Sequence, residues 1–271
     1  MFKLALAQML VEGGEPDRNL SRAGDRITEA ASQGADFVLL PETMDLGWTH
    51  SSAKTGAQPI PDGTAFQQLA KFAAEHRVHL CAGLTERDGD DVFNSAVIID
   101  DTGKLLLKHR KLNELEIGHE YYTQGDRLNV CRTRFGTIGL MICADGFAKD
   151  CVVSRSLGYM GADLILSPSA WAVPADHDNS ATPYGQLWRD SYIPVAREFS
   201  MWIASASNVG PITDGPWKGR KCIGCSLVID ANGYEIVQGP YGESAETILY
   251  VDIDPVARPA RGDGWSSLKT S

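Results

Sequence analysis

Short apolar runs alternate with amphipathic segments along most of the chain. Residues 1–8 form an apolar run that predicts a first strand. Pro16 opens a segment that reaches about Ser32 and keeps its apolar residues on one face, which predicts a helix. The apolar run Phe37–Leu40 follows as a predicted buried strand, and it delivers Pro41 and Glu42 at its end. This alternation of strands and helices favours an α/β fold.

The middle of the chain continues the pattern. We predict a helix over Ala65–His76, capped by Thr64, and a strand over Val78–Leu84. Val92–Asp100 and Lys104–Lys108 read as a hairpin. The polar stretch from His109 to Arg127 has no periodicity, and a loop of this length in a compact domain is usually functional or disordered.

A second predicted strand also ends at a chemically reactive residue. Val130–Arg134 and Thr137–Ile142 are predicted to pair, and the second leads directly into Cys143, from which a short helix continues toward Leu157. The stretch 161–168 (GADLILSP) then echoes 34–41 (GADFVLLP). Two such helix–turn–strand units suggest a pseudo-symmetric layered fold, although chance similarity at a common turn explains so short an echo equally well.

The last part of the chain predicts a helix, Gly185–Ser200, a strand, Met201–Ser207, and a Pro/Gly-rich loop, 211–220. Three further runs read as a terminal antiparallel set: Ile223–Ile229, Tyr234–Gln238 and Glu246–Ile253. The tail from Pro255 has no core pattern. We expect residues 255–271 to be an arm that packs on a partner subunit, or simply mobile.

Composition narrows the class of protein. With 271 residues, 43% of them hydrophobic, the chain is predicted to form one domain over 1–271. A net charge of −10 disfavours nucleic acid and anionic membranes as partners and favours a small molecule. Six cysteines without a signal peptide indicate free thiols in a reducing compartment, so we expect a cytoplasmic protein.

Three residues at the predicted strand ends combine into one chemistry. Cys143 lies at the carboxyl end of a buried strand, where α/β proteins usually bind ligands. A thiol becomes a nucleophile only as thiolate and therefore needs a base or a cation. Glu42 could accept the thiol proton, and Lys111 could stabilise a thiolate and an oxyanion.

The motifs around these residues resemble those of the nitrilase, or carbon-nitrogen hydrolase, superfamily. Pro41-Glu42, His109-Arg110-Lys111 and the stretch 139–145 (GLMICAD) occur in that family's order with similar spacing. Later stretches, 196–198, 208–210 and 224–226, are similar to further landmarks of the family. Any one motif is weak evidence, but the ordered set is strong.

The resemblance implies a four-layer α-β-β-α sandwich that assembles as a homodimer or higher oligomer and needs no cofactor. It implies that Glu42 is general base and acid, that Lys111 stabilises the oxyanion, and that Cys143 is the nucleophile. The backbone N–H of Ala144 is a second oxyanion donor in this interpretation. Family members often carry a second glutamate after the lysine, and the spacing selects Glu120 for it over Glu114 and Glu116, with the role of orienting Lys111 and the substrate nitrogen.

The residues after the cysteine indicate the branch of the family. True nitrilases continue Cys-Trp-Glu, whereas this chain has Cys143-Ala144-Asp145-Gly146, which favours amides over nitriles. The arginine pair of N-carbamoyl amino-acid hydrolases is replaced by Gly146 and Phe147. The subfamily stays open, with carbamoyl hydrolysis, nitrile hydrolysis and acyl transfer as alternatives on the same triad.

Aromatic residues in the loops are candidates for the wall of a substrate pocket. Trp171 falls where family members place such a residue, and Trp48, His177 and Tyr184 lie in loops that could reach the same mouth. Core packing is an equally common role for tryptophan.

Two further readings compete with the amidase interpretation. Cys222 and Cys225 form a C-x-x-C pair, which alone is weak evidence for a redox or zinc site because no second pair is spaced for it. A binding or scaffold protein is the non-enzymatic alternative, which the complete triad disfavours.

Overall fold

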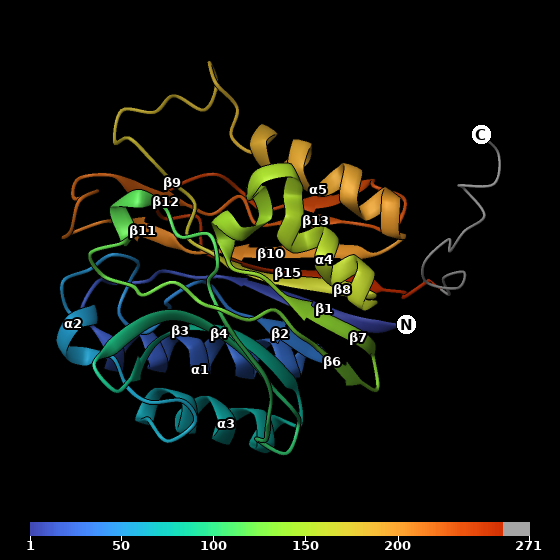
Figure 1. The fold of residues 1–271 in the computed structure, drawn as a ribbon, viewed down its shortest axis with the longest axis horizontal. Helices are drawn as coiled ribbons and strands as arrows, with labels where there is room; N and C mark the ends of the chain where they lie inside the picture. Colours follow the sequence, from blue (N-terminus) through green and yellow to red (C-terminus); the bar gives the residue numbers. More distant parts are fainter. Residues whose placement is uncertain (257–271) are drawn as a thin grey trace.

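The computed structural model describes residues 1–256. Its two six-stranded sheets pack face to face, with helices covering both outer faces (Figure 1). The order of layers is therefore helix, sheet, sheet, helix, as the sequence predicted. The expected arm from Pro255 lies almost entirely outside the described residues.

The first sheet is built mainly from the N-terminal half of the chain. Its order is β15-β1-β2-β3-β4-β5, with bounds Thr247–Ile253, Phe2–Gln8, Phe37–Leu39, His79–Asp88, Asp91–Ile99 and Leu105–Arg110. Helices α1 (Pro16–Ser32) and α3 (Thr64–His76) cover its outer face (Figure 1). A proline at the first turn of α1 has its φ preset for a helix, which explains the sharp start of this element.

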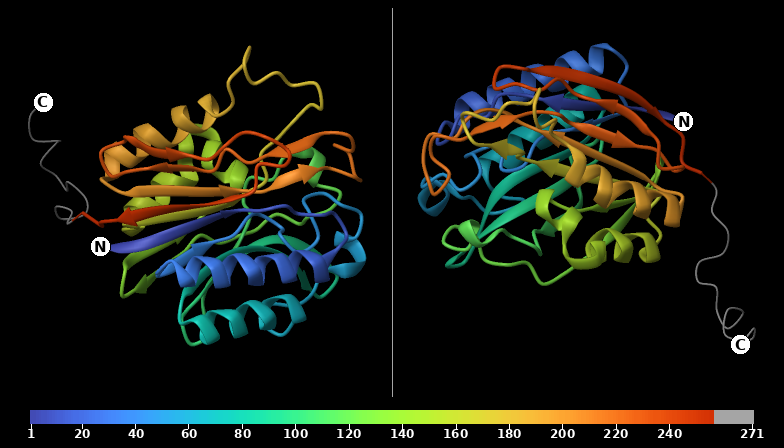
Figure 2. Two further views of the ribbon diagram at one scale, coloured as in Figure 1. Left: turned by 180° about the vertical axis from the view of Figure 1, so that it is seen from behind. Right: turned by 90° about the horizontal axis from the view of Figure 1, so that it is seen from above.

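The second sheet comes from the C-terminal half. Its order is β14-β13-β10-β8-β7-β6, with bounds Glu235–Gln238, Leu227–Ile229, Trp202–Ser207, Leu164–Ser169, Gly136–Leu140 and Val130–Thr133. Helices α4 (Val152–Met160) and α5 (Gln186–Phe199) cover its outer face, as both views in Figure 2 also show.

Smaller elements complete the fold. A three-stranded sheet has the order β11-β12-β9, with bounds Val209–Pro211, Lys221–Ile223 and Ala172–Val173. The remaining helices are α2 (Ala53–Gly56) and the short 3₁₀ turns η1 (Glu116–Gly118), η2 (Cys143–Phe147) and η3 (Lys149–Cys151).

Strand β1 shows how side-chain alternation divides the core. Leu4 and Leu6 belong to the large cluster that includes the space between the sheets, whereas Ala5 and Ala7 belong to the cluster under α1 and α3. All four side chains are fully buried, because each face of this central strand meets another layer.

A third, smaller apolar cluster lies apart from these two. Its buried members are Trp48, Ala53, Val92, Tyr122, Ala170 and Cys222, and partly buried Leu115, Ile117, Tyr121, Ile212 and Trp217 are among those that pack against it. We call this group the third cluster.

The predicted terminal antiparallel set is wrong in two respects. β13 and β14 pair in the second sheet, but β15 pairs with β1 in the first sheet. The predicted strand Ile223–Ile229 is also interrupted, since Gly224 and Cys225 both have positive φ between β12 and β13. Hydrophobic alternation predicts a strand but carries no information about which of two sheets receives it.

Candidate active site

The two halves of the sequence echo meet at the site. The strand within the first stretch, β2, leads to Glu42, and the strand of the second stretch, β8, ends at Ser169. The backbone N–H of Glu42 donates to the carbonyl of Ser169 over 3.3 Å. The two units therefore lie in opposite sheets with their carboxyl ends together, where residues from both halves can cooperate.

The backbone of Glu42 lies against a glycine. A Cβ added to Gly83, on β3, would come within 2.5 Å of the Cα of Glu42. Real side chains do not tolerate this separation, so glycine at position 83 permits the close approach that places the Glu42 loop.

Lys111 lies between two carboxylates. Its Nζ donates to Glu42 Oε1 over 2.8 Å and to Glu114 Oε1 over 3.0 Å. The side chains of all three are at most 3% exposed. Burial alone would lower the pKa of Lys111, but the charges of Glu114 and Glu42 outweigh it and hold the pKa well above the ordinary value. Lys111 is therefore a permanent cation at this position.

The second glutamate is Glu114, and the choice of Glu120 from spacing is wrong. Glu120 is exposed and lines a surface pocket with Arg87 and Tyr121. Glu114 lies three positions after Lys111, and the chain turns there toward η1, so the nearer carboxylate folds back onto the ammonium. The spacing from which Glu120 was selected did not reveal this turn.

Asn94 is a member of the site that the sequence analysis missed. Its Nδ2 donates to Glu42 Oε1 over 2.7 Å and to Glu114 Oε2 over 3.1 Å. A buried asparagine in the middle of a strand is an uncommon choice, and this polar residue in the apolar run of β4 was the available signal.

One oxygen of Glu42 has no hydrogen-bond partner among the described residues 1–256. Within residues 1–256, Glu42 Oε2 is buried and accepts no hydrogen bond, while Oε1 accepts from both Lys111 and Asn94. Burial raises the pKa of Glu42, and Lys111 opposes that shift. Glu42 therefore has one oxygen, Oε1, that is fixed by hydrogen bonds and a second oxygen, Oε2, that is available for proton transfer.

Cys143 begins the 3₁₀ turn η2 directly after β7 and Met141-Ile142. It is 9% exposed, and its φ of 43° lies in the left-handed region that non-glycine residues rarely adopt. Burial raises the pKa of the thiol well above its ordinary value; the charge of Glu42 adds to this shift, and Lys111 opposes it. The thiol is therefore protonated at rest and needs a base at the moment of attack.

A buried carboxylate connects the cysteine loop to the lysine loop. Asp145 Oδ1 accepts from the backbone N–H groups of Leu112 and Asn113, over 3.0 and 2.7 Å. Its Oδ2 accepts from Ile142 N–H and bonds His109 Nε2, each over 2.9 Å. Asn113 Nδ2 also donates to the carbonyl of Ala144 over 2.7 Å. These contacts fix the residues on either side of Cys143 relative to those around Lys111.

Comparison with known proteins agrees with this arrangement. The sequence profile of the carbon-nitrogen hydrolase family matches residues 3–261. The chain belongs to the carbon-nitrogen hydrolase family.

Individual relatives cover almost the whole chain. A nitrilase of Pyrococcus abyssi is 32% identical, over 94% of this chain and 90% of that protein. An omega-amidase of Mus musculus is 29% identical, over 93% of this chain and 88% of its own length. Among solved structures, a variant of the Nesterenkonia AN1 amidase from the nitrilase superfamily superimposes with a TM-score of 0.79 at 21% identity, covering 93% of this chain and 92% of that one. The chain is thus a carbon-nitrogen hydrolase with an α-β-β-α sandwich fold.

The expected pocket residues of this hydrolase fall into different surroundings. Trp48 lies over Lys111, with the ammonium 5.5 Å from the ring centroid, and its Nε1 donates to Glu114 Oε1 over 3.3 Å. Trp171 is 1% exposed and stacks on Trp188 at 4.6 Å, with Tyr184 6.0 Å away on its flank. His177 bonds the hydroxyl of Tyr241 over 3.0 Å. Trp48 is therefore the aromatic residue in direct contact with the charged centre.

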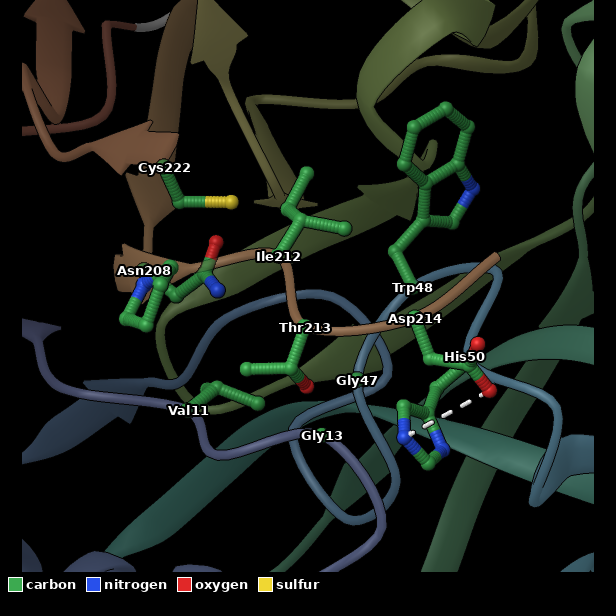
Figure 3. A pocket seen from close by; sticks show the side chains of 11 residues that line it. Val11, Gly13, Gly47, Trp48, His50, Asn208, Ile212, Thr213, Asp214 and Cys222 are labelled. Carbon is green, nitrogen blue, oxygen red and sulfur yellow. Dashed lines mark ion pairs between the residues drawn. The ribbon is translucent and has the colours of Figure 1, made fainter. Parts of the chain in front are cut away.

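A small cavity beside Trp48 is not large enough to be the substrate site. It lies between Trp48, Asn208, Ile212 and Cys222, where the 47–50 turn meets the β11–β12 loop (Figure 3). Its volume of about 20 Å³ is that of roughly one water molecule. Glu42, Lys111 and Cys143 do not line it, so the charged centre is enclosed separately.

Two sequence expectations concern other parts of the hydrolase. Cys222 and Cys225 are free and buried, and burial raises the pKa of each to about 12, which is unlike an activated redox pair. No helix within residues 1–256 has the length and apolar character needed to span a bilayer.

Proposed function

We propose that this carbon-nitrogen hydrolase cleaves a small non-peptide amide through a thioester on Cys143. The observation that carries the proposal is the buried ammonium of Lys111 between two carboxylates, on a loop that the hydrogen bonds of Asp145 hold beside the Cys143 loop. A protonated nucleophile beside a desolvated base is the arrangement expected for proton transfer during attack.

Acylation begins with attack of Cys143 Sγ on the amide carbonyl carbon, while the thiol proton passes to Glu42 Oε2. The carbonyl oxygen gains the negative charge, and Lys111 Nζ and the backbone N–H of Ala144 stabilise it. Glu42 then donates its proton to the nitrogen, the C–N bond breaks, and ammonia or an amine leaves.

In deacylation Glu42 acts first as a base toward water and then as an acid toward the thiolate. Water loses a proton to Glu42 and attacks the thioester carbon, the C–S bond breaks, and the proton returns from Glu42 to the Cys143 thiolate. Glu114 keeps Lys111 in place during both steps and orients the substrate nitrogen, which is the role that the sequence analysis assigned to Glu120.

Ammonia release tests the proposal directly. Wild type and Cys143→Ala are compared on small amides, carbamoyl compounds and nitriles, with the fold of the variant checked by circular dichroism. Wild type is expected to release ammonia from amides, and the folded variant to release none. A mass increase equal to the acyl group, located at Cys143 after an acid quench, identifies the thioester. Turnover by Cys143→Ala contradicts the mechanism.

A further inference from the structure

The third cluster reaches the proposed catalytic centre at two points. On the lysine side, Trp48 lies over Lys111 and donates to Glu114. On the cysteine side, the backbone of Ala170 lies near the Cys143 thiol and opposes the rise in its pKa. Trp48 and Ala170 both belong to the third cluster, so members of this apolar cluster lie near both the ammonium and the nucleophile.

Several separate segments contribute to this surface. Leu115 and Ile117 follow Glu114 in the loop after the lysine, and Ile212 and Trp217 come from the β11–β12 loop. The rings of Trp48 and Trp217 meet edge to face at 5.1 Å. The third cluster consequently contributes mainly aliphatic and aromatic side chains near the centre.

The centre itself has no spare positive charge. Lys111 forms ion pairs with both Glu42 and Glu114, which leaves the buried group with a net charge of −1 when both glutamates are ionised. In residues 1–256, two other basic side chains are recorded over rings of the third cluster: Lys54 over Tyr121 at 5.0 Å and Arg220 over Trp217 at 4.2 Å. Lys54 is exposed. Arg220 contacts the ring of Trp217, and Trp217 in turn contacts Trp48.

We propose that the acyl group of the substrate is uncharged and apolar, that it lies against the third cluster, and that a carboxylate on the acyl chain is rejected. A carboxylate there would lose its hydration among apolar side chains and face a centre that is already negative. An aliphatic or aromatic acyl group loses nothing by the same transfer and gains from burial. This inference rests on the proposed function, because it concerns the acyl side of the same thioester.

The test compares amides matched in chain length. Butyramide and valeramide are set against succinamate and glutaramate, and kcat/KM is measured by ammonia release. The neutral amides are expected to be at least 100-fold better. Arg220→Gln is expected to leave the ratio unchanged within a factor of two.

A charge introduced into the cluster provides the second arm. Ile117→Lys is expected to reduce the preference for neutral amides by at least tenfold, whereas Ile117→Met, which keeps the residue apolar, is expected to retain it. Turnover of succinamate by wild type that equals or exceeds turnover of butyramide overturns the inference. Loss of that succinamate turnover in Arg220→Gln would identify Arg220 as the partner of the carboxylate. That result leaves the proposed function standing as long as turnover still requires Cys143. Failure of every amide in wild type overturns both.

Discussion

Asp145 Oδ1 accepts the backbone N–H of Asn113 over 2.7 Å, which joins the residue two positions after Cys143 to the residue two positions after Lys111. The carboxylate is fully buried, and its other bonds go to Leu112, Ile142 and His109. Burial alone would raise the pKa of Asp145, but these donors outweigh it and lower the pKa below the ordinary value. The relative placement of nucleophile and cation is thus held by one ionised side chain that touches neither reacting atom in the proposed mechanism.

Asp145→Asn is expected to impair both folding and turnover. The amide presents an N–H₂ group to a site where only donors converge, so we expect a loss of about 2–4 kcal/mol in the free energy of unfolding. We also expect kcat to fall more than 100-fold in the variant that remains folded. Urea unfolding and steady-state kinetics measure the two effects. Unchanged kcat in a destabilised protein shows that Asp145 contributes to stability alone.

The same carboxylate gives the stability a dependence on pH. Its folded-state pKa lies below that of the unfolded chain, so its stabilising contribution is present above the ordinary aspartate value near 3.8 and is lost as the pH falls through the folded-state pKa. We expect the difference in unfolding free energy between wild type and Asp145→Asn to shrink as the pH falls from 7 to 3. Denaturant midpoints across this range provide the measurement, and a constant difference contradicts the assignment.

Glu114 and Glu120 form a natural pair for testing the second glutamate. Glu114→Gln removes one of the two charges beside Lys111, and we expect kcat/KM to fall at least 100-fold. Glu120→Gln alters an exposed residue, and we expect a change below twofold. Steady-state kinetics of both variants at one pH are sufficient. A larger loss of kcat/KM in Glu120→Gln than in Glu114→Gln would support Glu120 as the second glutamate.

Asn94→Asp places a third carboxyl group between Glu42 and Glu114. A further negative charge favours the protonated form of Glu42, so its raised pKa moves higher still. Because the mechanism requires ionised Glu42, the acid limb of the kcat/KM profile is expected to shift to higher pH. Asn94→Leu, which adds no charge, serves as the comparison. An acid limb that moves equally in both variants contradicts the electrostatic explanation.

Wild type should already show a displaced acid limb. Burial raises the pKa of Glu42 above the ordinary glutamate value near 4.5. Activity is therefore expected to rise with pH through a midpoint above 4.5. A pH profile of kcat/KM, measured for a substrate that does not titrate, locates this midpoint. A midpoint at or below 4.5 excludes Glu42 as the buried base.

The sequence by itself predicted the strands and helices and placed Glu42, Lys111 and Cys143 at strand ends, and its family resemblance implied the four layers. Period-two and helical patterns reflect burial on one or two faces, and β1 bears this out, since Leu4 and Ala5 face different cores. Glu42 and Lys111 were found because each follows a strand that ends at one edge of the first sheet, and Cys143 because it follows a strand of the second.

The tertiary structure decided what lies around those three residues. Glu114 rather than Glu120 reaches Lys111 because the chain turns immediately after the lysine, and local spacing does not specify the direction of a loop. Asn94 and Asp145 joined the site through hydrogen bonds to residues 20 or more positions away. β15 pairs with β1 in the first sheet and not with its predicted neighbours. The alternation of side chains along one strand does not specify which sheet edge the strand pairs with. Residue types and their order indicate the chemistry, but contacts between distant segments determine which side chains lie together.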